Sequence, residues 1–180
     1  MTVESRWIEV GGRRCRVFCL DLRHSHSAVR PLLVQLVSEH QEEDMEREAE
    51  MIFADFSLKT NDHQPLLATV PIADWELELM PWAEPAVSQR PEVGSGAMGT
   101  LNYLTDILLP ALIENKGFSL HDSQFKIPVV LGGYSLGGLF ALWAACQTDR
   151  FEAVAAGSPS LWAGDWPQYA TTHPMLAKHV

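Results

Sequence analysis

The chain has 180 residues, of which 47% are apolar and 20% are charged, and its formal net charge is −10. This composition is typical of a globular protein, and the length is sufficient for one sizeable core, so we expect a single domain over residues 1–180. The negative charge disfavours nucleic acids and anionic membranes as partners, because both carry negative charge themselves.

The cellular compartment can be predicted from the first residues and the cysteines. The start, MTVESRWIEV, lacks the basic and apolar segments of a secretory signal, and no apolar run approaches the ~20 residues of a membrane-spanning helix. Cys15 and Cys19, if they share a strand, are ~13 Å apart, which is too far for a disulfide. Three cysteines are few and odd in number. We therefore expect a protein of the reducing cytoplasm.

Strand and helix patterns alternate along the first part of the chain. Two short strands, Trp7–Val10 and Cys15–Leu20, flank a GGRR turn and predict a hairpin. The nearly all-apolar run Pro31–Val37 predicts a central strand that is buried on both faces. The segment EEDMEREAEMIFADF predicts a helix, because its apolar residues recur at helical spacing.

The second part of the chain continues this alternation. A strand is expected at Leu66–Ile72, followed by a long loop, ADWELELMPWAEPAVSQRPEVGSG, of the kind that forms lids or pocket walls. A helix is expected from near Ser95, interrupted at Pro110. The segments KIPVVLGG, LGGLFALWAACQ and EAVAAGS predict a strand, an apolar helix and a short strand. Together these patterns predict an α/β fold, a mainly parallel sheet with helices on both faces.

A serine lies between two glycines at the junction of a predicted strand and helix. The sequence GYSLG, residues 133–137, fits the G-x-S-x-G pattern of a nucleophile elbow, which needs an arriving strand and a departing helix. We expect Ser135 to be a nucleophile, with the N–H of Leu136 as one oxyanion donor and a second donor near Ser38 or Glu39. The alternative is a glycine-rich packing turn. A phosphate-binding loop is disfavoured, because no lysine follows the glycines.

The residues around this serine also resemble a known family. The segment VVLGGYSLGGLFALWAACQTDRFEAVAAGSPSLW is similar to the "putative esterase" family of α/β-hydrolases, which includes siderophore esterases and S-formylglutathione hydrolases. The similarity covers residues 31–162 and is strongest over 129–162. It implies an α/β-hydrolase-type sheet and hydrolysis of a small-molecule carboxylic ester without cofactor or metal. It also implies substrate contacts from four side chains: Tyr134, Trp82, Trp162 and Ser160.

The base and acid that would activate the serine are difficult to find. An imidazole must take the serine proton, and a carboxylate orients that imidazole. The family places both after further strands, whereas only 18 residues follow Trp162. These residues contain Asp165, His173 and His179, which are the candidates for acid and base. We expect instead that the chain is truncated within MLAKHV, the approach to a further strand, and that turnover is slow or absent.

Other features have simpler interpretations. His24 and His26 have the spacing of metal ligands on a strand but lie in a polar segment, so an exposed turn is expected. His40 follows the expected oxyanion strand and is a candidate to border the pocket, and Trp75 is expected in a pocket wall or in ordinary packing. Two alternative functions stay open: acyl transfer to an alcohol other than water, and a non-catalytic binding protein that keeps the fold.

Overall fold

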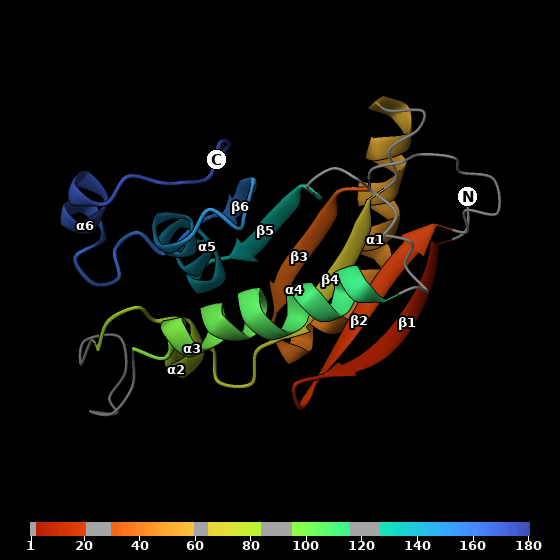
Figure 1. Ribbon diagram of the computed structural model, residues 1–180, viewed down its shortest axis with the longest axis horizontal. Helices are drawn as coiled ribbons and strands as arrows, with labels where there is room; N and C mark the ends of the chain where they lie inside the picture. Colours follow the sequence, from red (N-terminus) through yellow and green to blue (C-terminus); the bar gives the residue numbers. More distant parts are fainter. Residues whose placement is uncertain (1–2, 21–29, 60–64, 84–94, 116–126) are drawn as a thin grey trace.

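A six-stranded sheet forms the centre of the computed structural model, which describes residues 3–20, 30–59, 65–83, 95–115 and 127–180 (Figure 1). The strands follow the order β1-β2-β4-β3-β5-β6 across the sheet. Their bounds are β1 Val3–Val10, β2 Arg13–Leu20, β3 Leu32–Val37, β4 Leu66–Pro71, β5 Val129–Tyr134 and β6 Ala153–Gly157.

The sheet is mixed but mainly parallel, which confirms the predicted fold class. Strands β4, β3, β5 and β6 run parallel to one another, whereas β1 and β2 form an antiparallel hairpin that joins the sheet through β2 and β4. The hairpin turns at Gly11 and Gly12, both with positive φ (57° and 79°). Its strands are longer than predicted, because the pairing continues from Val10 opposite Arg13 to Val3 opposite Leu20.

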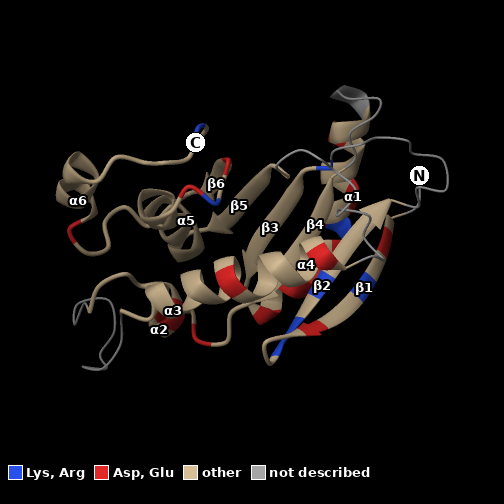
Figure 2. Ribbon diagram, viewed as in Figure 1, with Lys and Arg blue, Asp and Glu red and all other residues tan. Residues whose placement is uncertain are grey.

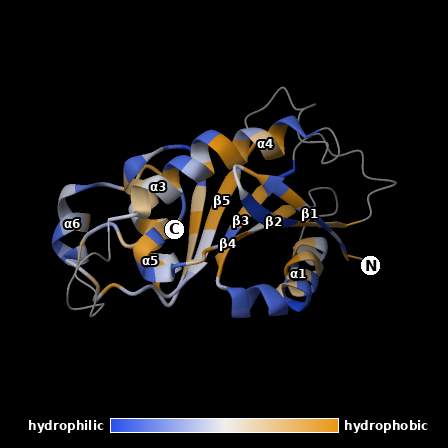
Figure 3. Ribbon diagram, turned by 90° about the horizontal axis from the view of Figure 1, so that it is seen from below, coloured by the Kyte–Doolittle hydropathy of each residue, from blue (hydrophilic) through white to orange (hydrophobic). Residues whose placement is uncertain are grey.

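Helices cover both faces of the sheet, as the sequence predicted. The segments α3, η1 and α4 lie on one side and α1 lies on the other (Figures 1 and 3). Helix α5 shares the larger core cluster with the α3–α4 segment, and α1 packs over a smaller cluster with β2 and β4. The bounds are α1 Glu39–Lys59, α2 Trp75–Leu79, α3 Ala97–Asn102, η1 Tyr103–Leu108, α4 Leu109–Glu114, α5 Leu136–Gln147 and α6 Trp166–Thr172.

The helix that contains Pro110 is not broken, contrary to the expected interruption. It widens instead into the π-helical turn η1, and the N–H of Leu109 donates to the carbonyl of Leu104, five residues earlier. A proline has no N–H to donate and its ring crowds the carbonyl four residues before it, so a wider turn at this point relieves both problems. The chain continues as α4, and Leu104, Leu108 and Leu112 are all buried.

The long segment expected to be a loop contains the short helix α2, which is a correction to the sequence prediction. Asp74 caps this helix, since its side chain accepts the N–H of Leu77 at 3.0 Å. One oxygen of Glu78 accepts the N–H groups of Ala73 and Asp74, and the other forms an ion pair with Arg13 of the hairpin. Such capping makes a single helical turn stable in a segment that pattern alone does not predict to be helical.

The last residues lie beside the edge strand β6. His179 forms a parallel bridge with Ala153, the N–H of Val154 donates to the His179 carbonyl at 3.0 Å, and Lys178 N–H donates to Glu152 at 2.9 Å. The expectation that MLAKHV is the approach to a further buried strand stays a prediction. Across the residues described above, no helix is long and apolar enough to cross a membrane. The single domain over residues 1–180 stays a prediction.

Candidate active site

The serine turn, residues Gly133–Gly137, connects β5 directly to α5 at the carboxyl end of the parallel strands. Ser135 is the residue before the helix and has φ 53° and ψ −116°, a backbone conformation that residues with a side chain rarely adopt. Such strain costs about 1–3 kcal/mol and persists where the surroundings enforce it, most often at functional sites. The strand, tight turn and helix predicted around Ser135 are therefore all present.

The glycines of the serine turn are required by close backbone contact. A Cβ added to Gly133 would lie 2.3 Å from the carbonyl carbon and oxygen of Gly137, so the two ends of the turn touch. A Cβ at Gly138 would lie 3.2 Å from the carbonyl oxygens of Gly133 and Gly157. The chain thus closes tightly on itself, and neither contact is with a side chain that could rotate away.

Ser135 is also held by hydrogen bonds on every side. Its N–H donates to the carbonyl of Gly157 at 2.9 Å, and its own carbonyl accepts the N–H groups of Leu139 at 3.1 Å and Ser160 at 3.0 Å. Its hydroxyl lies 3.1 Å from the hydroxyl of Ser160. Sequence reasoning named Ser160 as a substrate contact and missed its contact with Ser135, which no local pattern between residues 25 positions apart would reveal.

The two predicted oxyanion donors differ in their surroundings. Leu136 is the first residue of α5, so its N–H lies among those that have no acceptor within the helix and carry the partial positive charge of its N-terminus. The N–H of Ser38 donates to Gln41 Oε1 at 2.9 Å, and Gln41 N–H donates back to Ser38 Oγ at 3.4 Å. This reciprocal cap of α1 occupies the Ser38 donor, which would have to open before it could bind an oxyanion.

The predicted aromatic residues occupy different positions. Trp162 is 73% exposed and Tyr134 is 53% exposed, and they are close in sequence to Ser160 and Ser135 respectively. The ring of Trp82 packs against Gly164, where a Cβ would lie 2.5 Å from it, and contacts Tyr169 of α6 edge-on at 5.3 Å. Trp75 of α2 packs on the serine turn, since its ring lies 3.2 Å from the position of a Cβ on Gly137.

The candidate acid and bases make contacts other than to Ser135. His173 stacks on Tyr169 with ring centroids 3.9 Å apart, and its Nδ1 lies 3.1 Å from the Tyr169 carbonyl oxygen. His179 pairs with β6 through its backbone, and Asp165 precedes α6 without a side-chain bond to that helix. His40 is exposed in the first turn of α1. In the described parts of the chain, Ser160 is the hydrogen-bond partner of the Ser135 hydroxyl.

No set of metal ligands is found among the described residues, counting groups of three or more His, Cys, Asp and Glu. His24 and His26 lie outside the described residues, so their expected exposed turn stays a prediction. Cys15 and Cys19 lie on the same strand, β2, and neither forms a disulfide, in agreement with the strand-spacing argument.

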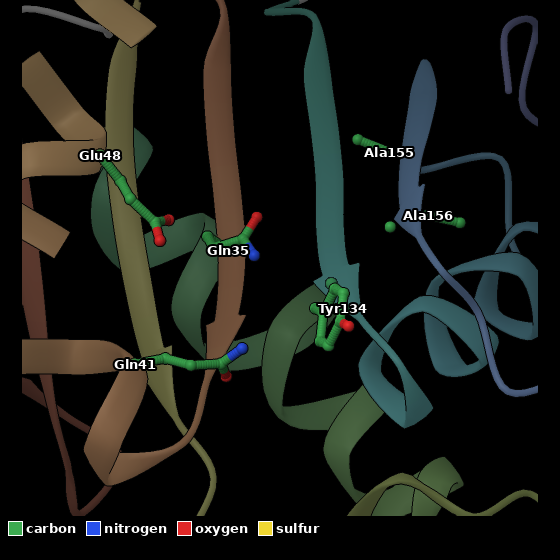
Figure 4. A pocket seen from close by; sticks show the side chains of 8 residues that line it. Gln35, Gln41, Glu48, Tyr134, Ala155 and Ala156 are labelled. Atoms are coloured by element: carbon green, nitrogen blue, oxygen red, sulfur yellow. The ribbon is translucent and has the colours of Figure 1, made fainter. Parts of the chain in front are cut away.

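A groove of 680 Å³ runs along the α1 side of the sheet and reaches the serine turn at Gly133 and Tyr134 (Figure 4). The side chains of Gln35 from β3 and of Gln41 and Glu48 from α1 line one part of it, opposite small residues of β6. The groove is thus lined by amides and a single carboxylate rather than by a dense cluster of charge.

The electrostatics of the serine turn come from the backbone. Strand β5 and helix α5 contain no Asp, Glu, Lys or Arg, whereas charged residues mark the hairpin, α1 and the α3–α4 segment (Figure 2). Within the part of the chain that the structure describes, the N-terminus of α5, which begins at the residue after Ser135, supplies positive potential at this turn. A negative charge that develops beside Ser135 would meet the backbone N–H groups of this N-terminus.

A mainly parallel sheet with helices on both faces, whose fifth strand ends in a strained serine turn followed at once by a helix, defines the α/β-hydrolase class of folds. The model of the family described as "Putative esterase" matches residues 51–180, and the chain belongs to this family. This result confirms the resemblance seen in the sequence. A comparison with curated protein sequences gave no significant match.

Solved structures of several hydrolases share the fold. The siderophore hydrolase EstB from Aspergillus nidulans is 19% identical with a TM-score of 0.65, and the match covers 92% of this chain and 58% of EstB. The BES protein from Bacillus cereus is 18% identical with a TM-score of 0.66, covering 99% of this chain and 71% of BES. The enterobactin hydrolase IroE, in complex with DFP, is 17% identical with a TM-score of 0.61, covering 88% and 64%. The chain thus spans 58% of the length of EstB.

Proposed function

We propose that this protein hydrolyses a small-molecule carboxylic ester through an acyl-enzyme on Ser135. The observation that carries the proposal is the strained backbone of Ser135, φ 53°, in a turn that leads directly into the N-terminus of α5. Membership of the "Putative esterase" family supports the reaction class. EstB is a siderophore hydrolase and IroE is an enterobactin hydrolase. Siderophore esters are therefore the first substrates to test.

In the proposed reaction, Ser135 Oγ attacks the ester carbonyl carbon as a base removes the hydroxyl proton. The carbonyl oxygen becomes an oxyanion, which the N–H of Leu136 stabilises together with a second donor, for which Ser38 is the candidate. The alcohol leaves with a proton returned by the base, and water then releases the acid from Ser135 in the same manner. The exposed rings of Trp162 and Tyr134 are proposed substrate contacts. Trp82 is a further candidate, although its ring is largely occupied by Gly164 and Tyr169.

We propose further that the base and its acid come from outside the described residues, in a native chain longer than 180 residues. The stacking of His173 on Tyr169 supports this, as does the 58% share of EstB that the chain spans. The intact mass of the protein from its native source is the test. A mass well above 20.1 kDa supports the proposal. A mass of 20.1 kDa contradicts it and makes His173, with Asp165, the pair to examine.

The compartment and partners follow from the same chemistry. Cys15, Cys19 and Cys146 form no disulfide, which supports the proposal that the protein acts in the reducing cytoplasm. The net charge of −10 supports a small-molecule ester rather than nucleic acid or an anionic membrane as its partner.

Labelling with a fluorophosphonate probe tests the nucleophile directly. The native-length wild-type protein, which would supply the base, is expected to acquire one covalent adduct, located at Ser135 by peptide mass spectrometry, and Ser135→Ala is expected to acquire none. Ser57→Ala is the matched control, since it removes a hydroxyl in α1 that donates to the backbone carbonyl of Phe53 at 2.8 Å, and it should label normally. Absence of labelling in the native-length wild type would reject the nucleophile and favour a binding protein. Added alcohols in an ester assay separate hydrolysis from acyl transfer.

A further inference from the structure

Three residues with side-chain hydroxyls are buried polar positions among the described residues: Thr69, Thr100 and Ser160. The hydroxyl of Thr69 bonds the carbonyl of Arg16 at 3.4 Å, and that of Thr100 bonds the carbonyl of Glu78 at 2.8 Å. Both contacts fix the backbone. Ser160, which is only 5% exposed, differs because its hydroxyl meets the hydroxyl of Ser135 at 3.1 Å. The buried hydroxyl of Ser160 therefore contacts the side chain that is proposed as the nucleophile.

The loop that carries Ser160 is fixed to the serine turn. The N–H of Ser160 donates to the Ser135 carbonyl at 3.0 Å, and the carbonyl of Ser160 accepts the N–H of Ala163 at 3.0 Å. Ser158 has a strained φ of 41°, and the Cα of Pro159 lies 3.2 Å from the position of a Cβ on Gly138. The backbone contact and the hydroxyl contact thus join the same two residues, so the Ser160 side chain has a defined position relative to Ser135.

The direction of the hydroxyl contact follows from the reaction. A hydroxyl has one hydrogen to donate and two lone pairs to accept with. If Ser135 donates to Ser160, its hydrogen points away from any base. If Ser160 donates, the Ser135 hydrogen is free for the base, and its oxygen gains a donor that strengthens as negative charge develops.

We propose that the Ser160 hydroxyl donates to Ser135 Oγ and is a positioning residue that holds the nucleophile oxygen for attack. This inference rests on the proposed function of Ser135. It assigns Ser160 a contact with the nucleophile in place of the substrate contact that the sequence suggested. Such a residue acts on the bond-forming step and leaves the binding of the substrate unchanged.

The kinetics of fluorophosphonate labelling separate these roles. In Ser160→Ala of the native-length protein, the maximal labelling rate at saturating probe is expected to fall about tenfold, the loss that corresponds to one hydrogen bond in the transition state. The probe concentration at half-maximal rate should not change. Ser57→Ala should match the wild type in both quantities. Ser160→Thr, which keeps the hydroxyl, is expected to recover most of the rate, with thermal melting used to confirm that each variant is folded.

Two kinetic results would overturn the proposal. A higher half-saturating concentration with an unchanged maximal rate in Ser160→Ala would show a substrate contact. An unchanged or faster maximal rate would show that Ser135 is the donor and that Ser160 competes with the base.

Absence of labelling in the wild type would count against the proposed function itself. Crystal structures of the wild type and of Ser160→Ala test the positioning role of Ser160 even in that case. A single Ser135 rotamer in the wild type and several in Ser160→Ala would support the role of Ser160. The same single rotamer in both proteins would overturn it.

Discussion

Two regions of the molecule are held together by different physics. The serine region, comprising β5, α5, β6 and the loop to Ala163, is closed by backbone contacts such as that between Gly133 and Gly137. The hairpin region, comprising β1, β2 and α1, has a regular antiparallel ladder between its strands and, beyond this ladder, contacts between charged and aromatic side chains. There the Arg16 guanidinium pairs with Glu46 and lies 4.7 Å from the ring centroid of Phe18, and the Arg14 guanidinium lies 4.3 Å from the ring centroid of Trp7.

This difference shows what each region can tolerate. Backbone groups in contact leave no room for an added carbon, and the strain has no side chain to absorb it. Long charged side chains can reorient and exchange partners with water, so single losses there cost little. Substitutions should therefore have large effects in the serine region and graded, mostly small effects in the hairpin region.

The largest effect is expected for Gly133→Ala. The added Cβ would lie 2.3 Å from backbone atoms of Gly137, so the turn must open, and we expect a loss of about 3 kcal/mol or more in the free energy of unfolding. Urea denaturation measures it. The matched control is Gly99→Ala on an exposed face of α3, where an added Cβ meets nothing within 4 Å and alanine should stabilise by about 0.5–1 kcal/mol. Equal unfolding midpoints for Gly133→Ala and wild type would contradict the backbone-contact account.

A smaller loss is expected for Arg13→Ala. This change removes the ion pair with Glu78 and the contact of the guanidinium with the Tyr103 ring, 4.8 Å from its centroid. The two side chains are 27% and 18% exposed, so the pair is partly screened, and we expect a loss of about 1–2 kcal/mol. Urea denaturation at low and high salt should show that part of this difference disappears with salt. A loss in the free energy of unfolding as large as that of Gly133→Ala would contradict the expectation that substitutions have smaller effects in the hairpin region.

Glu42 gives a pH-dependent prediction in the hairpin region. Burial raises the pKa of its carboxyl above the ordinary value, and Thr69 and Arg16 oppose the shift only in part. The folded state then binds this proton more tightly than the unfolded state, so its contribution to stability is lost as the pH rises from the ordinary carboxyl pKa through the raised one. We expect Glu42→Gln to reduce that loss. The stability of this variant relative to wild type should therefore be higher at neutral pH than at acidic pH. Parallel stability-against-pH curves for the two proteins would contradict this.

The smallest effect is expected for Arg47→Ala. Its guanidinium lies 3.9 Å from Asp44, and both side chains are well exposed, at 74% and 64%. The free energy of unfolding should change by less than about 0.5 kcal/mol. A thermal melt alongside Arg13→Ala provides the comparison, and an equal shift for the two variants would show that burial does not set the strength of these ion pairs.

The sequence predicted the fold class well, because the signals are local and repeated. The apolar run around Leu32–Val37 and the alternation of strands and helices were sufficient for a parallel sheet with two covered faces. Helix α2 was missed because it consists of one turn stabilised by Asp74 and Glu78, and Glu78 depends on Arg13, which is distant in the chain. The π-turn before Pro110 was missed because a proline in a helical pattern usually predicts a break, whereas here the helix widens around it and Leu109 N–H donates to the Leu104 carbonyl.

The candidate site was predicted only in part. Ser135 could be predicted because the glycines on both sides of it form a local pattern, which a tight turn between a strand and a helix requires. The contact of Ser160 with Ser135 and of Trp75 with Gly137 depends on chain segments that meet only in the folded sheet. The occupied N–H of Ser38 likewise depends on the orientation of the Gln41 side chain. Residue roles that depend on tertiary contacts could not be predicted, because no local sequence pattern indicates such contacts.

Helix α2 joins the two regions that otherwise differ so much. Through Glu78 it is tied to Arg13 of the hairpin, and through Trp75, one helical turn earlier, it rests on Gly137. The position of Trp75 behind the serine turn therefore depends on a helix whose other end is fixed by an ion pair to the hairpin. Natural selection on the rate of a reaction at Ser135 would then also act on an arginine more than 120 positions earlier in the chain.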